Sequence, residues 1–126
     1  MAAAKGPVFK KPEDKDYTGA RNYLSLLCTD KDAARFVKAL RKAKTIERCA
    51  KDILRASGLP LLPRDNQRVA EDLAKIREGK ALPPVLLVRG DFERGVALII
   101  ADGYHRTCAL YLHEPDTLVP CRLVER

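Results

Sequence analysis

The segment ALIIADGYHRTCALYL, residues 97–112, decides the fold. Its first five residues are apolar, which predicts a buried strand, and the spacing of the apolar residues after Arg106 predicts a helix. Backbone N–H groups at the start of a helix are free and carry partial positive charge. The segment therefore predicts an anion site, best suited to phosphate, at a strand-to-helix junction. The polar cluster at that junction is Asp102, Gly103, His105 and Arg106.

The composition is that of one soluble globular domain. The chain has 126 residues, of which 46% are hydrophobic and 33% are charged. No apolar run approaches the roughly 18 residues that a membrane-spanning helix needs, and the N-terminus lacks the apolar core of a signal peptide. We therefore expect a cytoplasmic protein that does not contact membranes.

The four cysteines are not spaced as a metal or redox motif, because no pair has the C-x-x-C arrangement. We expect reduced thiols that pack as small hydrophobic side chains, with a redox role or a disulfide as the alternative. The residues concerned are Cys28, Cys49, Cys108 and Cys121.

Positive charge is concentrated in the N-terminal half. The net charge is +7; residues 1–60 carry 14 Lys and Arg against 7 Asp and Glu, whereas residues 61–126 carry 10 of each. If the protein has a nucleic-acid surface, that surface is expected in the first half.

The N-terminal half is predicted to be helical. Residues 1–17 are rich in charge and proline and predict a flexible arm, and residues 18–126 predict a single domain whose first part, 18–58, is a basic helical segment. Within that segment we expect a helix over 18–27, with Tyr23, Leu24 and Leu27 facing inward. A second helix is expected after Thr29 or Asp30, and a third from Thr45 to Gly58.

The third of these helices would align four basic side chains at helical spacing. Such a face could contact nucleic-acid phosphates or an acidic partner, and the alternative is an ordinary solvated helix face. The four residues are Lys44, Arg48, Lys51 and Arg55.

The C-terminal part, residues 59–126, is predicted to hold the sheet. An extended connector over 59–63 precedes a helix that Asp65 or Asn66 caps and that continues to about residue 78. Strands are expected over 85–88, 96–101 and 119–124, with a hairpin over 89–95. This order predicts an α+β fold, also described as mixed α/β, in which helices pack on a small mixed sheet.

Residues 63–124 resemble the ParB/sulfiredoxin superfamily, also described as the ParB-like N-terminal or ParB-like nuclease domain. The features that carry the resemblance have a fixed order: a helix ending at Gly79, the PVLLV segment at 84–88, a hairpin, the LIIADGYHR segment at 98–106, a helix and the VPCRLV strand at 119–124. The Asp-Gly-x-His-Arg motif matches the variant of the family signature that has His and Arg after the glycine.

The resemblance implies that this motif binds the phosphate groups of a nucleotide, with the arginine and the helix N-terminus as an anion clamp. Members of the superfamily differ in chemistry: some are CTP-binding clamps on DNA, and others are nucleases, nucleotide-dependent kinases or, in sulfiredoxin, an ATP-dependent reductase of oxidised cysteine. The resemblance also implies that the cofactor is a nucleotide, ATP or CTP, with Mg²⁺.

The sequence departs from two subfamilies of this superfamily, which narrows the activities that we expect. Sulfiredoxin has its catalytic cysteine directly before the His-Arg pair, where this sequence has Tyr104, and Cys108 lies one helical turn further on. The CTP clamps have an arginine-rich motif in place of residues 104–106 and a helix-turn-helix region downstream, whereas this sequence ends at Arg126. We therefore expect neither sulfiredoxin chemistry nor a partition clamp.

Each candidate site residue has a functional and a structural interpretation. Arg106 can bind two phosphate oxygens or pair with Asp102 or Glu71. His105 can act as an acid or base or cap the helix, and Asp102 can act as a base, hold Mg²⁺ or be an N-cap. We assign Asp102 and His105 as catalytic candidates and no residue as a metal ligand. The phosphate or nucleotide candidates are Gly103, Tyr104, His105, Arg106, Thr107, Asn66 and Arg68.

Four functions remain open from the sequence, of which the last is an interaction module that keeps the fold without catalysis. The first is a ParB/sulfiredoxin-like domain that binds phosphate or a nucleotide. The second is a nucleotide hydrolase, kinase or metal-dependent nuclease, for which Glu71, Asp72 or Glu93 would have to supply a second carboxylate. The third is a small basic nucleic-acid-binding regulatory protein without catalysis.

Overall fold

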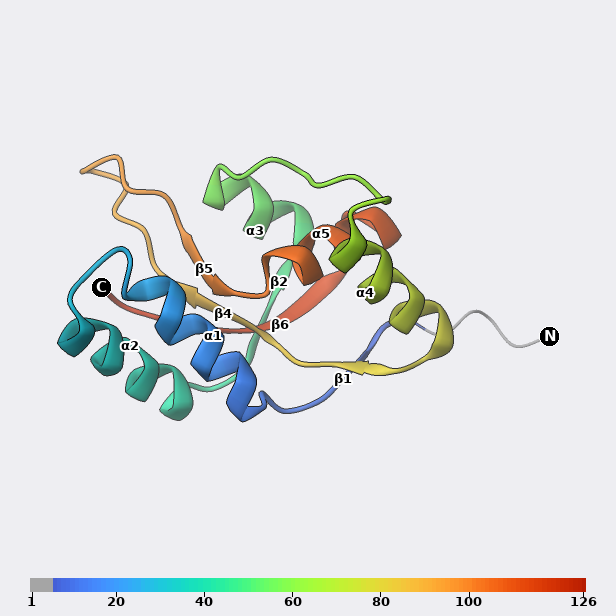
Figure 1. Cartoon of the computed structure of the whole chain (residues 1–126). Coiled ribbons are helices and arrows are strands. Elements are labelled where there is room, and N and C mark those ends of the chain that lie inside the picture. The colour runs from blue at the N-terminus through green and yellow to red at the C-terminus, as the bar shows by residue number, and fades with distance from the viewer. Residues whose placement is uncertain (1–5) are drawn as a thin grey trace.

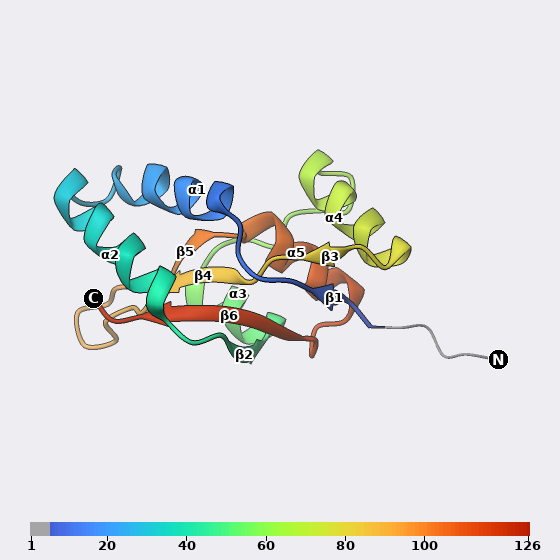
Figure 2. The same ribbon diagram turned by 90° about the horizontal axis from the view of Figure 1, so that it is seen from below.

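The fold is built on a four-stranded mixed sheet in the order β2-β6-β4-β5 (Figure 2). The structure is a computed structural model that describes residues 6–126. β6 pairs antiparallel with β2 and parallel with β4, and β4 pairs antiparallel with β5. A second sheet joins β1 to β3 in parallel. The strands are β1 (Val8–Phe9), β2 (Ile46–Cys49), β3 (Ala81–Leu82), β4 (Val85–Val88), β5 (Ile99–Asp102) and β6 (Leu118–Val124).

Helices cover both faces of the four-stranded sheet, as the predicted α+β class requires (Figure 1). Alternate residues of β4 enter two separate cores: Val85 and Leu87 pack with α3, α4 and α5, whereas Leu86 and Val88 pack with α1 and α2. All four are buried, which confirms the prediction of a strand covered on both sides. The helices are α1 (Asp14–Leu24), α2 (Asp30–Lys42), α3 (Ala50–Ser57), α4 (Gln67–Glu78) and α5 (Tyr104–His113).

The first helix begins four residues earlier than predicted, so much of the expected flexible arm is regular structure. Val8 and Phe9 pair with β3, and α1 starts at Asp14 because the Asp16 side chain accepts the backbone N–H of Glu13 at 2.7 Å and so caps the first turn. Residues 1–5 of the predicted arm lie outside the described range. Tyr23 and Leu27 are 42% and 53% exposed. Their predicted inward orientation is therefore wrong.

The predicted third helix is half strand. Residues 46–49 form β2, and the helix α3 begins only at Ala50, whose backbone N–H donates to Thr117 O at 2.9 Å. Pairing of β2 with β6 outweighs the local helical spacing of these residues. The predicted basic face over residues 44–55 therefore does not exist. Arg48 lies on β2, while Lys51 and Arg55 on α3 pair with Asp116 and Asp52.

The C-terminal elements lie close to their predicted positions. Asn66 caps α4 through its side chain, and Gly79 ends that helix in the left-handed conformation. β6 and β4 match the predicted strands, whereas β5 begins at Ile99 rather than Val96, which makes only an isolated bridge with Asp91. No helix within residues 6–126 is both long and apolar enough to cross a membrane.

The cysteines have the predicted state. All four are free thiols; Cys108 and Cys121 are buried, and Cys28 and Cys49 are partly buried. Burial raises the pKa of Cys121 to about 11, which keeps that thiol protonated near neutral pH.

Arg122 connects the sheet to the two helices on one face. Its Nη1 donates to the hydroxyl of Tyr17 at 3.0 Å and to the carbonyl oxygens of Leu40 and Arg41 at 3.2 and 2.9 Å. Replacing Arg122 with methionine is expected to lower the free energy of unfolding by about 1–2 kcal/mol, because these acceptors lose a charged donor. Urea denaturation measures this change.

A matched surface variant tests that expectation. Arg89 makes an exposed ion pair with Glu125, and Arg89→Met is expected to cost less than about 1 kcal/mol. Equal losses for Arg122→Met and Arg89→Met would show that the contacts of Arg122 with α1 and α2 add no more stability than a surface ion pair.

Candidate anion site

The turn between β5 and α5 leaves the start of the helix open. Gly103 is the N-cap of α5 with φ of +105°, and no side chain caps the helix. Thr107 closes the first turn by donating its backbone N–H to Gly103 O at 2.8 Å. Asp102 is therefore not the N-cap, which corrects one of its predicted interpretations. The uncapped N–H groups and the helix dipole are thus placed at the junction where the sequence predicts an anion site.

Gly103 also allows the backbone to approach two side chains. A Cβ atom built on this residue would lie 2.6 Å from Val85 Cγ1 and 2.8 Å from Arg106 Nη2. Only glycine fits both this space and the positive φ. The predicted role of Gly103 in close backbone approach is confirmed.

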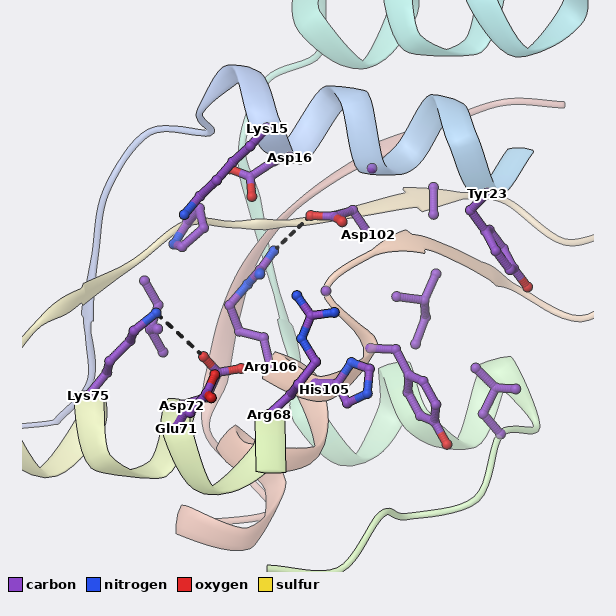
Figure 3. A pocket seen from close by; sticks show the side chains of 18 residues that line it. Lys15, Asp16, Tyr23, Arg68, Glu71, Asp72, Lys75, Asp102, His105 and Arg106 are labelled. Atoms are coloured by element: carbon purple, nitrogen blue, oxygen red, sulfur yellow. Dashed lines mark ion pairs between the residues drawn. The ribbon is translucent and has the colours of Figure 1, made fainter. Parts of the chain in front are cut away.

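The helix start opens into a cleft of about 730 Å³ between α1 and α4. Figure 2 shows these two helices on either side of the point where β5 leads into α5, and Figure 3 shows side chains from both helices reaching into the space. Basic and acidic groups are mixed along its walls. The charged and histidine side chains of the lining are Lys15, Asp16, Arg68, Glu71, Asp72, Lys75, Asp102, His105 and Arg106.

Arg106 is part of both the scaffold and the cleft. Its Nη2 donates to Pro84 O at 3.0 Å and lies 3.5 Å from Asp102 Oδ2, so the predicted ion pair with Asp102 forms. The side chain is 11% exposed. Within residues 6–126 its buried Nε has no hydrogen-bond partner. An unsatisfied buried nitrogen is costly. Because this Nε is enclosed by protein atoms, a ligand in the cleft would meet the accessible part of the Arg106 guanidinium instead.

His105 and Asp72 have shifted pKa values in opposite directions. Burial, with a further contribution from the positive charge of Arg68, lowers the pKa of His105, although Asp72 opposes this shift. Burial raises the pKa of Asp72, against the nearby positive charges, of which Arg106 acts most strongly. The imidazole is therefore mostly neutral near pH 7 and can donate one hydrogen bond to an anion or accept a proton.

Asp102 is the most perturbed group in the cleft. Burial raises its pKa to about 6, and the negative charge of Asp16 adds to this shift while Arg106 reduces it. A carboxyl with this pKa exchanges its proton near physiological pH, which is a property of acid–base groups. Gly19 allows the close contact between α1 and this carboxyl, since a Cβ there would lie 2.7 Å from Asp102 Oδ1.

Tyr104 lies at the edge of the cleft, and its hydroxyl donates to Pro60 O at 2.5 Å. Burial raises its pKa, so the hydroxyl stays protonated. This contact ties the connector over 59–63 to α5, and it leaves the ring beside the space where a planar ligand group could stack.

Two predicted phosphate contacts are wrong. Thr107 is fully buried, and its hydroxyl donates to Gly103 O at 2.9 Å instead of facing the cleft. The Asn66 side chain accepts the backbone N–H groups of Arg68 and Val69 as the cap of α4, and it does not line the cleft. Arg68 does line the cleft, as predicted.

Of the three residues that could supply a second carboxylate, two line the cleft and one does not. Glu71 and Asp72 line the cleft, whereas Glu93 is exposed on the turn between β4 and β5 and does not. In the range 6–126, no group of three or more His, Cys, Asp or Glu residues is placed to hold a metal ion.

Sequence reasoning missed the contribution of α1. Lys15, Gly19 and Tyr23 lie at i, i+4 and i+8 on one face of this helix, and all three line the cleft with Asp16. A glycine within an amphipathic helix, flanked by a lysine and a tyrosine at one-turn spacing, was the available signal for a helix surface in close contact with another group. Lys75 on α4 was missed as well.

Comparisons of the chain with protein-family models, curated proteins and solved structures find no match.

Proposed function

We propose that this protein binds the phosphate group of a small ligand in the cleft between α1 and α4. The observation that carries the proposal is the uncapped N-terminus of α5, which opens into the cleft beside two arginines. The arginines are Arg68 and Arg106, and both line the cleft. Backbone N–H groups, a helix dipole and guanidinium groups are the usual components of a phosphate site.

A nucleotide with Mg²⁺ is the ligand class we propose for this site, with ATP and CTP as the first candidates. The volume of about 730 Å³ is within the range of pockets for molecules of that size. Tyr23, Leu59 and Tyr104 line the same cleft and offer apolar contacts for a base. The resemblance of the Asp-Gly-x-His-Arg motif to the ParB/sulfiredoxin signature also supports this ligand class.

Arg68 offers the cleanest test, because it is exposed and its guanidinium makes no ion pair or hydrogen bond within the described residues. Arg68→Met is expected to weaken binding of ATP or CTP in the presence of Mg²⁺ at least about tenfold, through loss of a charged hydrogen bond. Isothermal titration calorimetry measures the dissociation constants.

The matched control is Arg77→Met, which removes an exposed arginine of the same helix that does not line the cleft. It should bind as the wild type does. No binding of phosphate or of any nucleotide to the wild type would refute the proposal, and so would equal weakening by the two variants.

A second candidate function is nucleic-acid binding by α2. Lys31, Arg35, Lys38 and Lys42 recur at i, i+4, i+7 and i+11 and are all exposed, so they form a cationic stripe in place of the face predicted over 44–55. The apolar side of α2 is buried against the sheet, so only its charged side is available to contact nucleic acid. DNA affinity should then fall steeply with salt. Neutralising Lys38 and Lys42 should reduce that slope, and an unchanged slope would reject this function.

A further inference from the structure

Two carboxyl groups from different elements line the same cleft. Asp16 comes from the first turn of α1 and is 5% exposed, and Asp102 ends β5. Figure 3 shows the Asp16 side chain directed from α1 toward the space that Asp102 and Arg106 occupy. The lack of a side chain at Gly19 brings the α1 backbone against the Asp102 carboxyl. We call Asp16 and Asp102 the carboxyl pair.

The carboxyl pair has few compensating partners. Asp16 Oδ2 accepts the backbone N–H of Glu13 at 2.7 Å. Asp102 Oδ2 has Arg106 Nη2 at 3.5 Å, but that nitrogen also donates to Pro84 O at the shorter distance of 3.0 Å. Within the described residues, the ion pair of Asp102 is therefore long, and its guanidinium is shared with a backbone carbonyl in a partly desolvated wall. The negative charge of Asp16 further disfavours ionisation of Asp102, so Asp102 is the member of the pair that gains the proton.

We propose that the carboxyl pair takes up a proton when an anion binds in the cleft, so that acidification strengthens anion binding. This inference rests on the proposed function and adds a regulation to the same site. An anion beside Arg106 disfavours negative charge on Asp102, which makes protonation easier. By thermodynamic reciprocity, protonation of the pair then favours the anion to the same extent. Protonation also releases Arg106 from its ion pair, which leaves the guanidinium for the ligand.

The pH range follows from the groups involved. The pKa of Asp102, about 6, places the proton exchange of the free protein between neutral and mildly acidic pH. His105 is the other group that would gain a proton beside an anion, since its ordinary pKa lies in the same range. The remaining charged groups that face the pair across the cleft are Lys15 on α1, Arg68, Glu71, Asp72 and Lys75 on α4, and Arg106 on α5. Of the acids on α4, Asp72 has a raised pKa, so it needs its own control variant.

The test uses sulfate, which remains a dianion throughout this pH range and adds no titration of its own. Binding is followed by ¹H–¹⁵N NMR of the Tyr104 and His105 amides at pH 5.5 and pH 7.5, with ionic strength held constant by sodium chloride. We expect the wild type to bind sulfate about three- to tenfold more tightly at pH 5.5. Sulfate should also raise the pH midpoint of the Asp102 carboxyl carbon resonance.

Four variants identify which group causes the pH dependence of sulfate binding. Asp16→Asn and Asp102→Asn are expected to lose most of the pH dependence, and the asparagine at position 16 can still accept the Glu13 N–H. His105→Asn and Asp72→Asn are expected to keep it. The spectra also report whether each variant is folded. The inference is overturned if the gain at pH 5.5 persists in Asp102→Asn, or if His105→Asn or Asp72→Asn alone abolishes it.

The outcomes separate this inference from the function on which it rests. Sulfate that binds equally at both pH values leaves the anion site in place and overturns the proton coupling alone. Absence of sulfate binding at both pH values overturns the coupling and counts against the anion site itself.

Discussion

Replacing Gly103 with alanine is expected to lower the free energy of unfolding by about 3–4 kcal/mol and to abolish anion binding in the cleft. Two physical effects contribute. An alanine with φ of +105° is strained by about 1–2 kcal/mol. Its Cβ would also lie 2.6 Å from Val85 Cγ1 on the buried strand β4, where neither backbone nor side chain has room to retreat.

The second clash explains the loss of binding. The same Cβ would lie 2.8 Å from Arg106 Nη2, the nitrogen that donates to Pro84 O. Relief of this contact moves the guanidinium away from its position beside the helix start. We therefore expect the Arg106 contact and the open first turn to be lost together.

Gly95→Ala is the matched control for backbone strain. Gly95 also has a positive φ of +70°, but a Cβ there would have no atom within 4 Å. This variant should cost only about 1 kcal/mol and should leave binding unchanged. Urea denaturation measures both stabilities, and sulfate titration by NMR measures binding. Equal losses for the two variants would show that the close approach to Val85 and Arg106 has no energetic effect.

The segment over 97–112 could be predicted because its signals are local. An apolar run, a glycine and an amphipathic helix each depend on neighbouring residues, and the structure has them in that order. The same holds for Asn66 and Gly79, whose capping roles depend on one turn of helix. These local signals placed Gly103, His105 and Arg106 at the cleft.

The errors occurred where tertiary contacts decide the structure. Residues 46–49 have helical spacing, but they become the edge strand β2 because β6, which is distant in the sequence, supplies hydrogen-bond partners. The wall that α1 contributes was missed for a similar reason. The spacing of Gly19 with Lys15 and Tyr23 indicates only a helix surface in close contact with another group, and that group is defined only when α1 packs against β5. Thr107 fits a phosphate-binding pattern locally, but it faces the core.

Replacing Asp102 with asparagine is expected to stabilise the ligand-free protein at pH 7.5 by about 1–2 kcal/mol. The pKa of this carboxyl in the folded protein is about 6 because burial and Asp16 disfavour its charge more than Arg106 favours it. Ionisation of Asp102 is therefore a net cost to the folded state near neutral pH. Asparagine has nearly the same shape, can still accept from Arg106 and carries no charge.

The pH dependence follows from the direction of the shift. Because the folded-state pKa exceeds that of an unfolded chain, the folded protein binds more protons between about pH 4 and pH 6. The stability that this group contributes is therefore present below about pH 4 and is lost as the pH rises through 6. The full shift of about two units corresponds to at most about 3 kcal/mol, and partial exposure to solvent reduces it.

Urea denaturation of Asp102→Asn and wild type from pH 4 to pH 7.5 tests this expectation through the difference between the two proteins, in which the other titrating groups largely cancel. The difference should be near zero at pH 4 and grow through pH 6. Glu93→Gln, on the exposed turn, should stay within about 0.5 kcal/mol of wild type throughout. A variant less stable than wild type at pH 7.5 would mean that the ion pair with Arg106 outweighs the burial of this carboxyl. A gain in stability together with sulfate binding as tight at pH 7.5 as at pH 5.5 would instead mean that the charge of Asp102 costs free energy both in folding and in anion binding near neutral pH, as the proton coupling requires.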